Sequence, residues 1–138
     1  MSTILTHPHS VNYTKPPMTK VLWVNAAPDT SFDAQSVSLS ENAFNYDVIV
    51  VQFKAYTGTG TSGARNGFSY YWMNSNRSHG TFIQMCSGSN NRLGHRYWTV
   101  SDTGLSCSFN AAYYNGSSGN TYCIPQSIIG IKLGGLIS

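Results

Sequence analysis

The chain has little charge and few of the residues that build helices. Aspartate, glutamate, lysine and arginine make up 9% of its 138 residues, against about a quarter in an ordinary soluble domain. Only four lysines and one glutamate are present, while valine, isoleucine, threonine and the aromatic residues are plentiful. The latter residues favour strands. The length suits one domain, and the composition predicts that this domain is all-β.

The sequence also lacks the patterns of metal, redox and membrane segments. Its three cysteines, Cys86, Cys107 and Cys123, form no CxxC or Cys/His spacing, and their odd number leaves at least one unpaired. Each lies in an alternating apolar stretch, so we expect buried free thiols and no cofactor. A membrane-spanning helix needs about 20 consecutive apolar residues, and no run in the sequence approaches that length. No signal peptide opens the chain. We therefore expect a protein made in a cytoplasm, without membrane insertion.

Its few acidic side chains predict no active site. Asp102 lies in the hairpin-turn stretch VSDTG, and the other acids lie in turns or flank strands, so no facing carboxylate pair is expected. No GxSxG nucleophile motif is present. Net charge is +3, and the basic residues are scattered apart from Arg92, His95 and Arg96, which is sparser than a nucleic-acid-binding surface. We expect no catalytic residue, no bound metal and no nucleic-acid partner.

Prolines set the first residues apart from the rest. Three of the five prolines fall within residues 1–19, and no hydrophobic periodicity survives them. We interpret residues 1–19 as an extended N-terminal arm, about 60 Å long when fully stretched. It either anchors the chain on a larger particle or crosses onto a neighbouring subunit, and a disordered terminus is the alternative. The candidate anchor residues are His7, His9, Tyr13, Lys15, Pro16 and Pro17, of which the two histidines also offer a weak metal site on a trimer axis.

From Lys20 onward, short apolar blocks alternate with turn residues. Residues 35–40 alternate strictly, whereas Val48–Val51 form an unbroken apolar run that predicts a central strand buried on both faces. About eight strands at intervals of about ten residues predict an antiparallel sandwich or jelly roll. Strands are expected at 20–25, 35–40, 46–56, 68–73, 81–87, 96–102, 105–109 and 121–133, with a short one at 111–114; the outward-facing loops are expected at 57–67, 74–80, 88–96 and 110–121.

The last apolar run, IPQSIIGIKL, alternates like a strand. We expect Ile129, Ile131 and Leu133 to supply its buried face and to close the sandwich. Gly130 is expected to admit the close approach of another group. The predicted partner of this strand is the first one, at residues 20–25.

The aromatic blocks supply the candidate binding residues. In FSYYWM, Phe68, Tyr70 and Trp72 share one face and Tyr71 lies on the other. Tyrosine and tryptophan beside asparagine, arginine and histidine are typical of sugar-binding surfaces and of protein interfaces; an ordinary core with a half-buried rim is the third interpretation. The tyrosines of AAYYNG adjoin a loop rich in glycine, serine and asparagine, which favours exposure. The candidate surface-binding residues are Tyr71, Arg92, His95, Arg96, Tyr113, Tyr114 and Asn115.

Several of these blocks resemble a known family. The stretches Lys20–Trp23, Ser38–Glu41, Ile49–Tyr56 and Ile128–Lys132 resemble the C-terminal domain of bacteriophage tail and head fibres. The resemblance runs over residues 20–138 as a series of short apolar blocks. It implies a trimeric β-sandwich on the virion surface, with loops that face the host and with no enzymatic activity or cofactor.

One departure from that family bears on how the protein docks. Family members carry a long N-terminal shaft, whereas this chain has residues 1–19 in its place, so we expect direct docking to a capsid or baseplate. Two virion roles remain open, a receptor-binding head that grips a host glycan or protein and a capsid decoration protein. A carbohydrate-binding module is the third hypothesis. In each virion role, a homotrimer assembled in the host cytoplasm displays residues 20–138.

Overall fold

The fold is all-β, as predicted. The computed structural model describes residues 13–56, 66–73, 80–87 and 92–136, and it contains twelve strands, one 3-10 helix and no α-helix within them. The elements are β1 (Tyr13–Lys15), β2 (Met18–Val24), β3 (Gln35–Ser38), η1 (Ala43–Asn45), β4 (Val48–Tyr56), β5 (Gly67–Trp72), β6 (Gly80–Ser87), β7 (Arg92–Val100), β8 (Ser106–Phe109), β9 (Tyr113–Tyr114), β10 (Ser117–Ser118), β11 (Tyr122–Lys132) and β12 (Gly135–Leu136).

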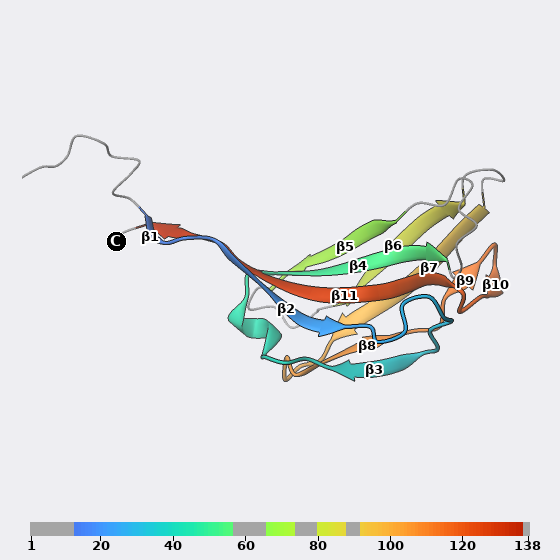
Figure 1. Cartoon of the computed structure of the whole chain (residues 1–138), viewed down its shortest axis with the longest axis horizontal. Helices are drawn as coiled ribbons and strands as arrows, with labels where there is room; N and C mark the ends of the chain where they lie inside the picture. Colours follow the sequence, from blue (N-terminus) through green and yellow to red (C-terminus); the bar gives the residue numbers. More distant parts are fainter. Residues whose placement is uncertain (1–12, 57–65, 74–79, 88–91, 137–138) are drawn as a thin grey trace, which may run out of the picture.

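Two antiparallel sheets form the predicted sandwich (Figure 1). The four-stranded sheet has the order β2-β11-β4-β5. The second sheet has the order β10-β9-β7-β8-β3, with β6 paired to the other edge of β7. Large side chains from both sheets fill the space between them, among them Ile49, Phe53 and Trp98, which are almost completely buried. The described strands of the two sheets therefore share one hydrophobic core.

Strand β11 lies at the centre of the four-stranded sheet, between β2 and β4. Its antiparallel pairing with β2 confirms the predicted contact between the last and first strands. Its buried face is the reverse of the predicted one: Ile128 is fully buried, whereas Ile129 and Ile131 are half-buried and Leu133 is exposed. Alternation separates the two faces of a strand without saying which one meets the second sheet, and we chose the wrong one.

The close approach predicted at Gly130 is confirmed, and the approaching group is the ring of Tyr46. A Cβ atom at this glycine would lie 2.6 Å from the ring. The hydroxyl of Tyr46 donates to the carboxylate of Glu41, which also accepts from Nζ of Lys20 at 2.9 Å. The bonds from Lys20 and then Tyr46 lower the pKa of Glu41, and the bond to Glu41 raises the pKa of Tyr46. This arrangement holds the Tyr46 ring over the glycine.

A two-stranded ribbon of β1 and β12 extends from one end of the sandwich and carries both ends of the described chain (Figure 1). Strand β2 begins at Met18, so the boundary predicted between residues 19 and 20 falls inside a strand. Among the candidate anchor residues, Tyr13 and Lys15 belong to β1, Pro16 and Pro17 are exposed between β1 and β2, and His7 and His9 lie outside the described residues.

The thiols of Cys107 and Cys123 are free and buried, as predicted. Burial raises the pKa of each to about 12. The side chain of Cys86 lies outside the described residues, so a thiol measurement needs a Cys86→Ser background.

In that background, we expect neither remaining thiol to react promptly with a thiol reagent at mildly alkaline pH, because thiolate is the reactive form and both sulfurs are buried. In concentrated guanidinium chloride both thiols should react at once. A spectroscopic thiol titration in the two solvents checks this expectation. Rapid reaction of either thiol in native buffer would contradict it.

Candidate binding surface

Four aromatic side chains gather on the outer face of the second sheet. They are Phe82 of β6, His95 and Tyr97 of β7, and Tyr113 of β9, and we call them the aromatic cluster. Strand pairing places Phe82 opposite Tyr97 and His95 opposite Tyr113. The rings of His95 and Tyr113 are stacked, with centroids 5.4 Å apart and planes 20° apart, while the centroids of Phe82 and Tyr97 lie 5.0 Å apart. The cluster brings together two of the predicted binding residues, His95 and Tyr113.

Alternation along β7 explains why these rings face outward. Gly94, Arg96 and Trp98 are buried, whereas Tyr97 is 53% exposed and His95 is half-buried. His95 was expected in a turn, yet β7 begins at Arg92, so it lies on a strand. Sequence reasoning did not select Tyr97, because His95 was placed in the turn before the strand and the shared face of the two rings was therefore missed.

The same outer face continues as a row of small hydroxyl groups. Thr99 of β7 pairs with Ser108 of β8, which pairs with Ser36 of β3. The hydroxyl oxygens of Ser36 and Ser108 lie 2.6 Å apart. An uncharged ligand with an apolar face and a rim of hydroxyls, such as a sugar, matches aromatic rings beside hydroxyl groups.

The hairpin of β9 and β10 carries Tyr113 to the surface. Its two-residue turn, Asn115 and Gly116, has φ values of 51° and 85°, and positive φ at both positions is what a type I′ turn requires. Asn115 is therefore exposed, as predicted. Tyr114 points elsewhere: its ring is stacked on that of Tyr122, with centroids 3.8 Å apart and planes 2° apart. Of the three predicted hairpin residues, Tyr113 and Asn115 are exposed and Tyr114 is half-buried.

The prediction that Arg96 binds a ligand at the surface is wrong. Its side chain is completely buried, and its guanidinium donates hydrogen bonds to the backbone carbonyl oxygens of Phe32 (2.9 Å), Asn110 (2.6 Å), Tyr122 (3.2 Å) and Cys123 (2.9 Å). Burial lowers the pKa of Arg96 to about 10, so it stays protonated at neutral pH. Alternation along β7 turns it inward between two outward-facing neighbours.

The choice of Tyr71 is also corrected. Tyr71 is half-buried and packs against the hydrophobic core, whereas Phe68, Tyr70 and Trp72 are exposed. The predicted division of this strand into two faces is confirmed, and the face that we selected is the inner one. For Arg92, the structure describes the backbone at the start of β7 and not the side chain.

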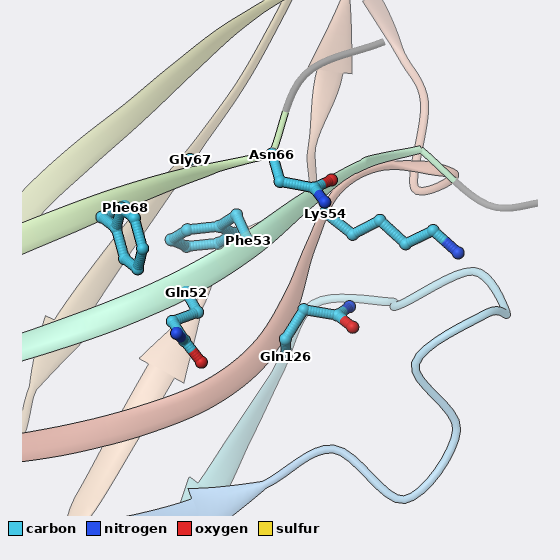
Figure 2. A pocket seen from close by; sticks show the side chains of 7 residues that line it. All are labelled: Gln52, Phe53, Lys54, Asn66, Gly67, Phe68 and Gln126. Atoms are coloured by element: carbon cyan, nitrogen blue, oxygen red, sulfur yellow. The ribbon is translucent and has the colours of Figure 1, made fainter. Parts of the chain in front are cut away.

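A pocket opens beside the second half of β4 and the start of β5 (Figure 2). These strand ends lie away from the terminal ribbon (Figure 1). The pocket has a volume of about 420 Å³. Its lining residues come from three strands and the segment before β5, so no single stretch of sequence marks it. They are Gln52, Phe53, Lys54, Asn66, Gly67, Phe68 and Gln126.

Hydrogen bonds hold two of the pocket's amides in place. The amide nitrogen of Gln126 donates to the carbonyl oxygens of Pro28 at 3.3 Å and Ile124 at 3.2 Å, and the amide oxygen of Gln52 accepts from the hydroxyl of Ser127. Within the described part of the chain, the amide nitrogen of Gln52 and the amide oxygen of Gln126 make no hydrogen bond. These two glutamines therefore leave one amide nitrogen and one amide oxygen for a polar ligand.

No protein-family model and no curated protein matches this chain. Across the described ranges, no helix is long and apolar enough to cross a membrane. Those same residues include no group of three histidine, cysteine, aspartate or glutamate side chains that could hold a metal ion.

Proposed function

We propose that this chain is a non-enzymatic structural protein of a bacteriophage particle, a small trimeric receptor-binding head. In this proposal the N-terminal residues dock to the capsid or baseplate and residues 20–138 are displayed on the virion surface. The observation that carries the proposal is the separation of the two ends of the sandwich. The ribbon of β1 and β12 projects from one end, and the hairpin of β9 and β10 lies at the other (Figure 1). Attachment at the ribbon leaves the hairpin end free to meet a host.

The aromatic cluster supports a receptor-binding role and points to a glycan as the ligand. Tyr97 and Tyr113 are 53% and 43% exposed, beside a row of serine and threonine hydroxyls. Aromatic rings stack on the apolar faces of sugars, while hydroxyl groups bond the sugar rim. This chemistry fits a glycan of the host cell surface.

The test is competition for adsorption. Purified protein is expected to block adsorption of the phage that encodes it to cells of its host. We expect a Tyr97→Ser, Tyr113→Ser double variant to need at least about tenfold more protein for the same block, because exposed tyrosines concentrate binding energy. Leu105→Ser is the matched control, since Leu105 is an exposed apolar residue in the turn between β7 and β8.

The possible outcomes test the aromatic cluster as the ligand site separately from the receptor-binding role. A folded double variant that blocks phage adsorption as well as the wild type does would show that the aromatic cluster does not bind the receptor. Wild-type protein that neither binds the cells nor slows adsorption would reject the receptor-binding role. Tens to hundreds of copies on the phage shell would then indicate a decoration protein, for which the same terminal ribbon serves as the docking element. Glycan binding without association with any particle would indicate a carbohydrate-binding module.

A further inference from the structure

The outer face of the four-stranded sheet is apolar at its centre. Val21 of β2, Ile129 of β11, Val50 of β4 and Tyr70 of β5 are successive cross-strand partners and form one row across all four strands. An antiparallel sheet with one face in water normally carries polar side chains there. The hydroxyl of Tyr70 is the one polar side-chain group in this row, although Tyr70 and Val21 are 63% and 51% exposed.

A second row continues this surface toward the terminal ribbon. It consists of Thr19, Ile131, Val48 and Trp72, again as successive cross-strand partners. Trp72 is 55% exposed, and Ile131 is half-buried. The two rows together place a broad aliphatic and aromatic surface on one side of the sandwich.

A third row ends the surface near the pocket. Val24 and Phe68 stand at its two edges, 63% and 64% exposed, with Ser127 and Gln52 between them. We call the residues of the three rows the apolar face. Polar side chains occupy the two central positions of this third row, next to the pocket.

The exposed area is large for a single chain in water. The three aromatic and two valine side chains together leave on the order of 600 Å² of apolar surface exposed. The largest apolar patch on a monomeric protein is about 300–600 Å², and each partner in a standard interface buries about 800 Å². The apolar face is therefore at the upper end of what a monomer exposes and approaches the area that one partner contributes to a standard interface.

The lack of charge on the apolar face favours a second copy of the same chain as its partner. No charged residue lies in the three rows, and Lys54 at the margin is paired with Asp29. A second copy of the same surface thus meets it without like-charge repulsion, and interfaces between identical chains are the more apolar class. Three copies that turn this face toward a common axis bury such side chains between their sheets, in the manner of a sandwich core.

We infer that the apolar face is the contact surface between copies of this chain, so that each sandwich is one subunit of a homo-oligomer. The inference supplies the contact surface for the trimer of the proposed function, and it rests on that proposal for the number of copies. The aromatic cluster on the opposite sheet stays free for a ligand in this arrangement.

The test is the mass of the wild-type chain and of charged variants in solution, measured by analytical ultracentrifugation over a concentration series. The wild type is expected to sediment as an oligomer at micromolar concentrations. Tyr70→Glu places a charge in the middle row of the apolar face, on the edge strand β5, and is expected to weaken association at least about a hundredfold. Leu105→Glu, at another exposed apolar residue that lies outside the face, is expected to leave the mass unchanged.

Two results would overturn the inferred contact surface. A wild-type chain that is monomeric throughout the series overturns the inference, as does a folded Tyr70→Glu variant that remains oligomeric. Val24→Lys, at the opposite edge of the face, replaces Tyr70→Glu if circular dichroism shows that variant to be unfolded. A monomer that still blocks phage adsorption would reject the contact surface and keep the receptor-binding role. An oligomer that fails to block phage adsorption would keep the contact surface and reject the receptor-binding role.

Discussion

Replacing Arg96 with methionine is expected to lower the free energy of unfolding by about 3–5 kcal/mol. The guanidinium is the hydrogen-bond donor to four backbone carbonyl oxygens, and methionine fills a similar space without a donor. A buried carbonyl that loses its partner costs about 1–3 kcal/mol. The expected loss is therefore among the largest that a single substitution produces in this chain.

The position of Arg96 explains why its hydrogen bonds matter to the whole fold. It joins the loop after β2, through Phe32, to the chain after β8, through Asn110, and to the start of β11. At the start of β11, Cys123 has a φ of 49°, which is unfavourable for a residue other than glycine. The bond from Nε of Arg96 to the carbonyl oxygen of Cys123 helps to hold that conformation. Without it, we expect this end of the sandwich to open first.

Denaturant unfolding at a fixed protein concentration measures the effect. Lys20→Met is the control, because Lys20 forms an exposed ion pair with Glu41, and such pairs contribute less than about 1 kcal/mol. Arg96→Lys should fall between the two, since an ammonium group keeps the charge but reaches fewer of the carbonyls. A loss below about 1 kcal/mol for Arg96→Met would show that water replaces the guanidinium at these carbonyls.

The Gly130→Ala substitution is expected to destabilise the fold by about 2–3 kcal/mol. The added Cβ would lie 2.6–2.8 Å from three atoms of the Tyr46 ring, closer than atoms pack. The ring has little freedom to move, since it is 6% exposed and its hydroxyl is bonded to Glu41. Relief therefore requires a shift of β11, which pairs with strands on both sides.

A second strand glycine provides the control for this prediction. A Cβ at Gly80 would touch only the hydroxyl of Thr99, at an ordinary 3.5 Å, so Gly80→Ala should change the stability by less than about 0.5 kcal/mol. Combining Gly130→Ala with Tyr46→Ala should cost less than the sum of the two single changes, because removal of the Tyr46 ring abolishes its clash with the new Cβ. Additive losses in thermal or denaturant unfolding would exclude the Tyr46 ring as the cause.

Strand positions were largely predictable from local patterns. The alternation at residues 35–40 and the apolar run of Val48–Val51 correspond to β3 and to the central strand β4. The short strand expected at 111–114 is β9, which ends in a turn of Asn115 and Gly116. These predictions succeeded because strand periodicity and turn chemistry act over a few neighbouring residues.

The candidate site was predictable only in part. His95 and Tyr113 belong to the aromatic cluster, but Arg96 and Tyr71 face inward. Composition selected all four alike, because aromatic and basic side chains are common in binding surfaces. Nothing in the sequence near Arg96 indicates that four carbonyl groups from three distant segments converge on it. The contacts that satisfy a buried arginine are made only when those segments come together.

The sequence by itself determined an all-β chain, the spacing of its strands and the division of each strand into two faces. Only the tertiary structure decided which of the two faces is buried. The exposed face of β5 and of β11 is at least as apolar as the buried face of the same strand, so composition does not identify which face is buried. The choice depends on which face meets the opposite sheet, and that contact joins residues far apart in the chain. For the same reason, the apolar face and the aromatic cluster appear only once the strands are paired.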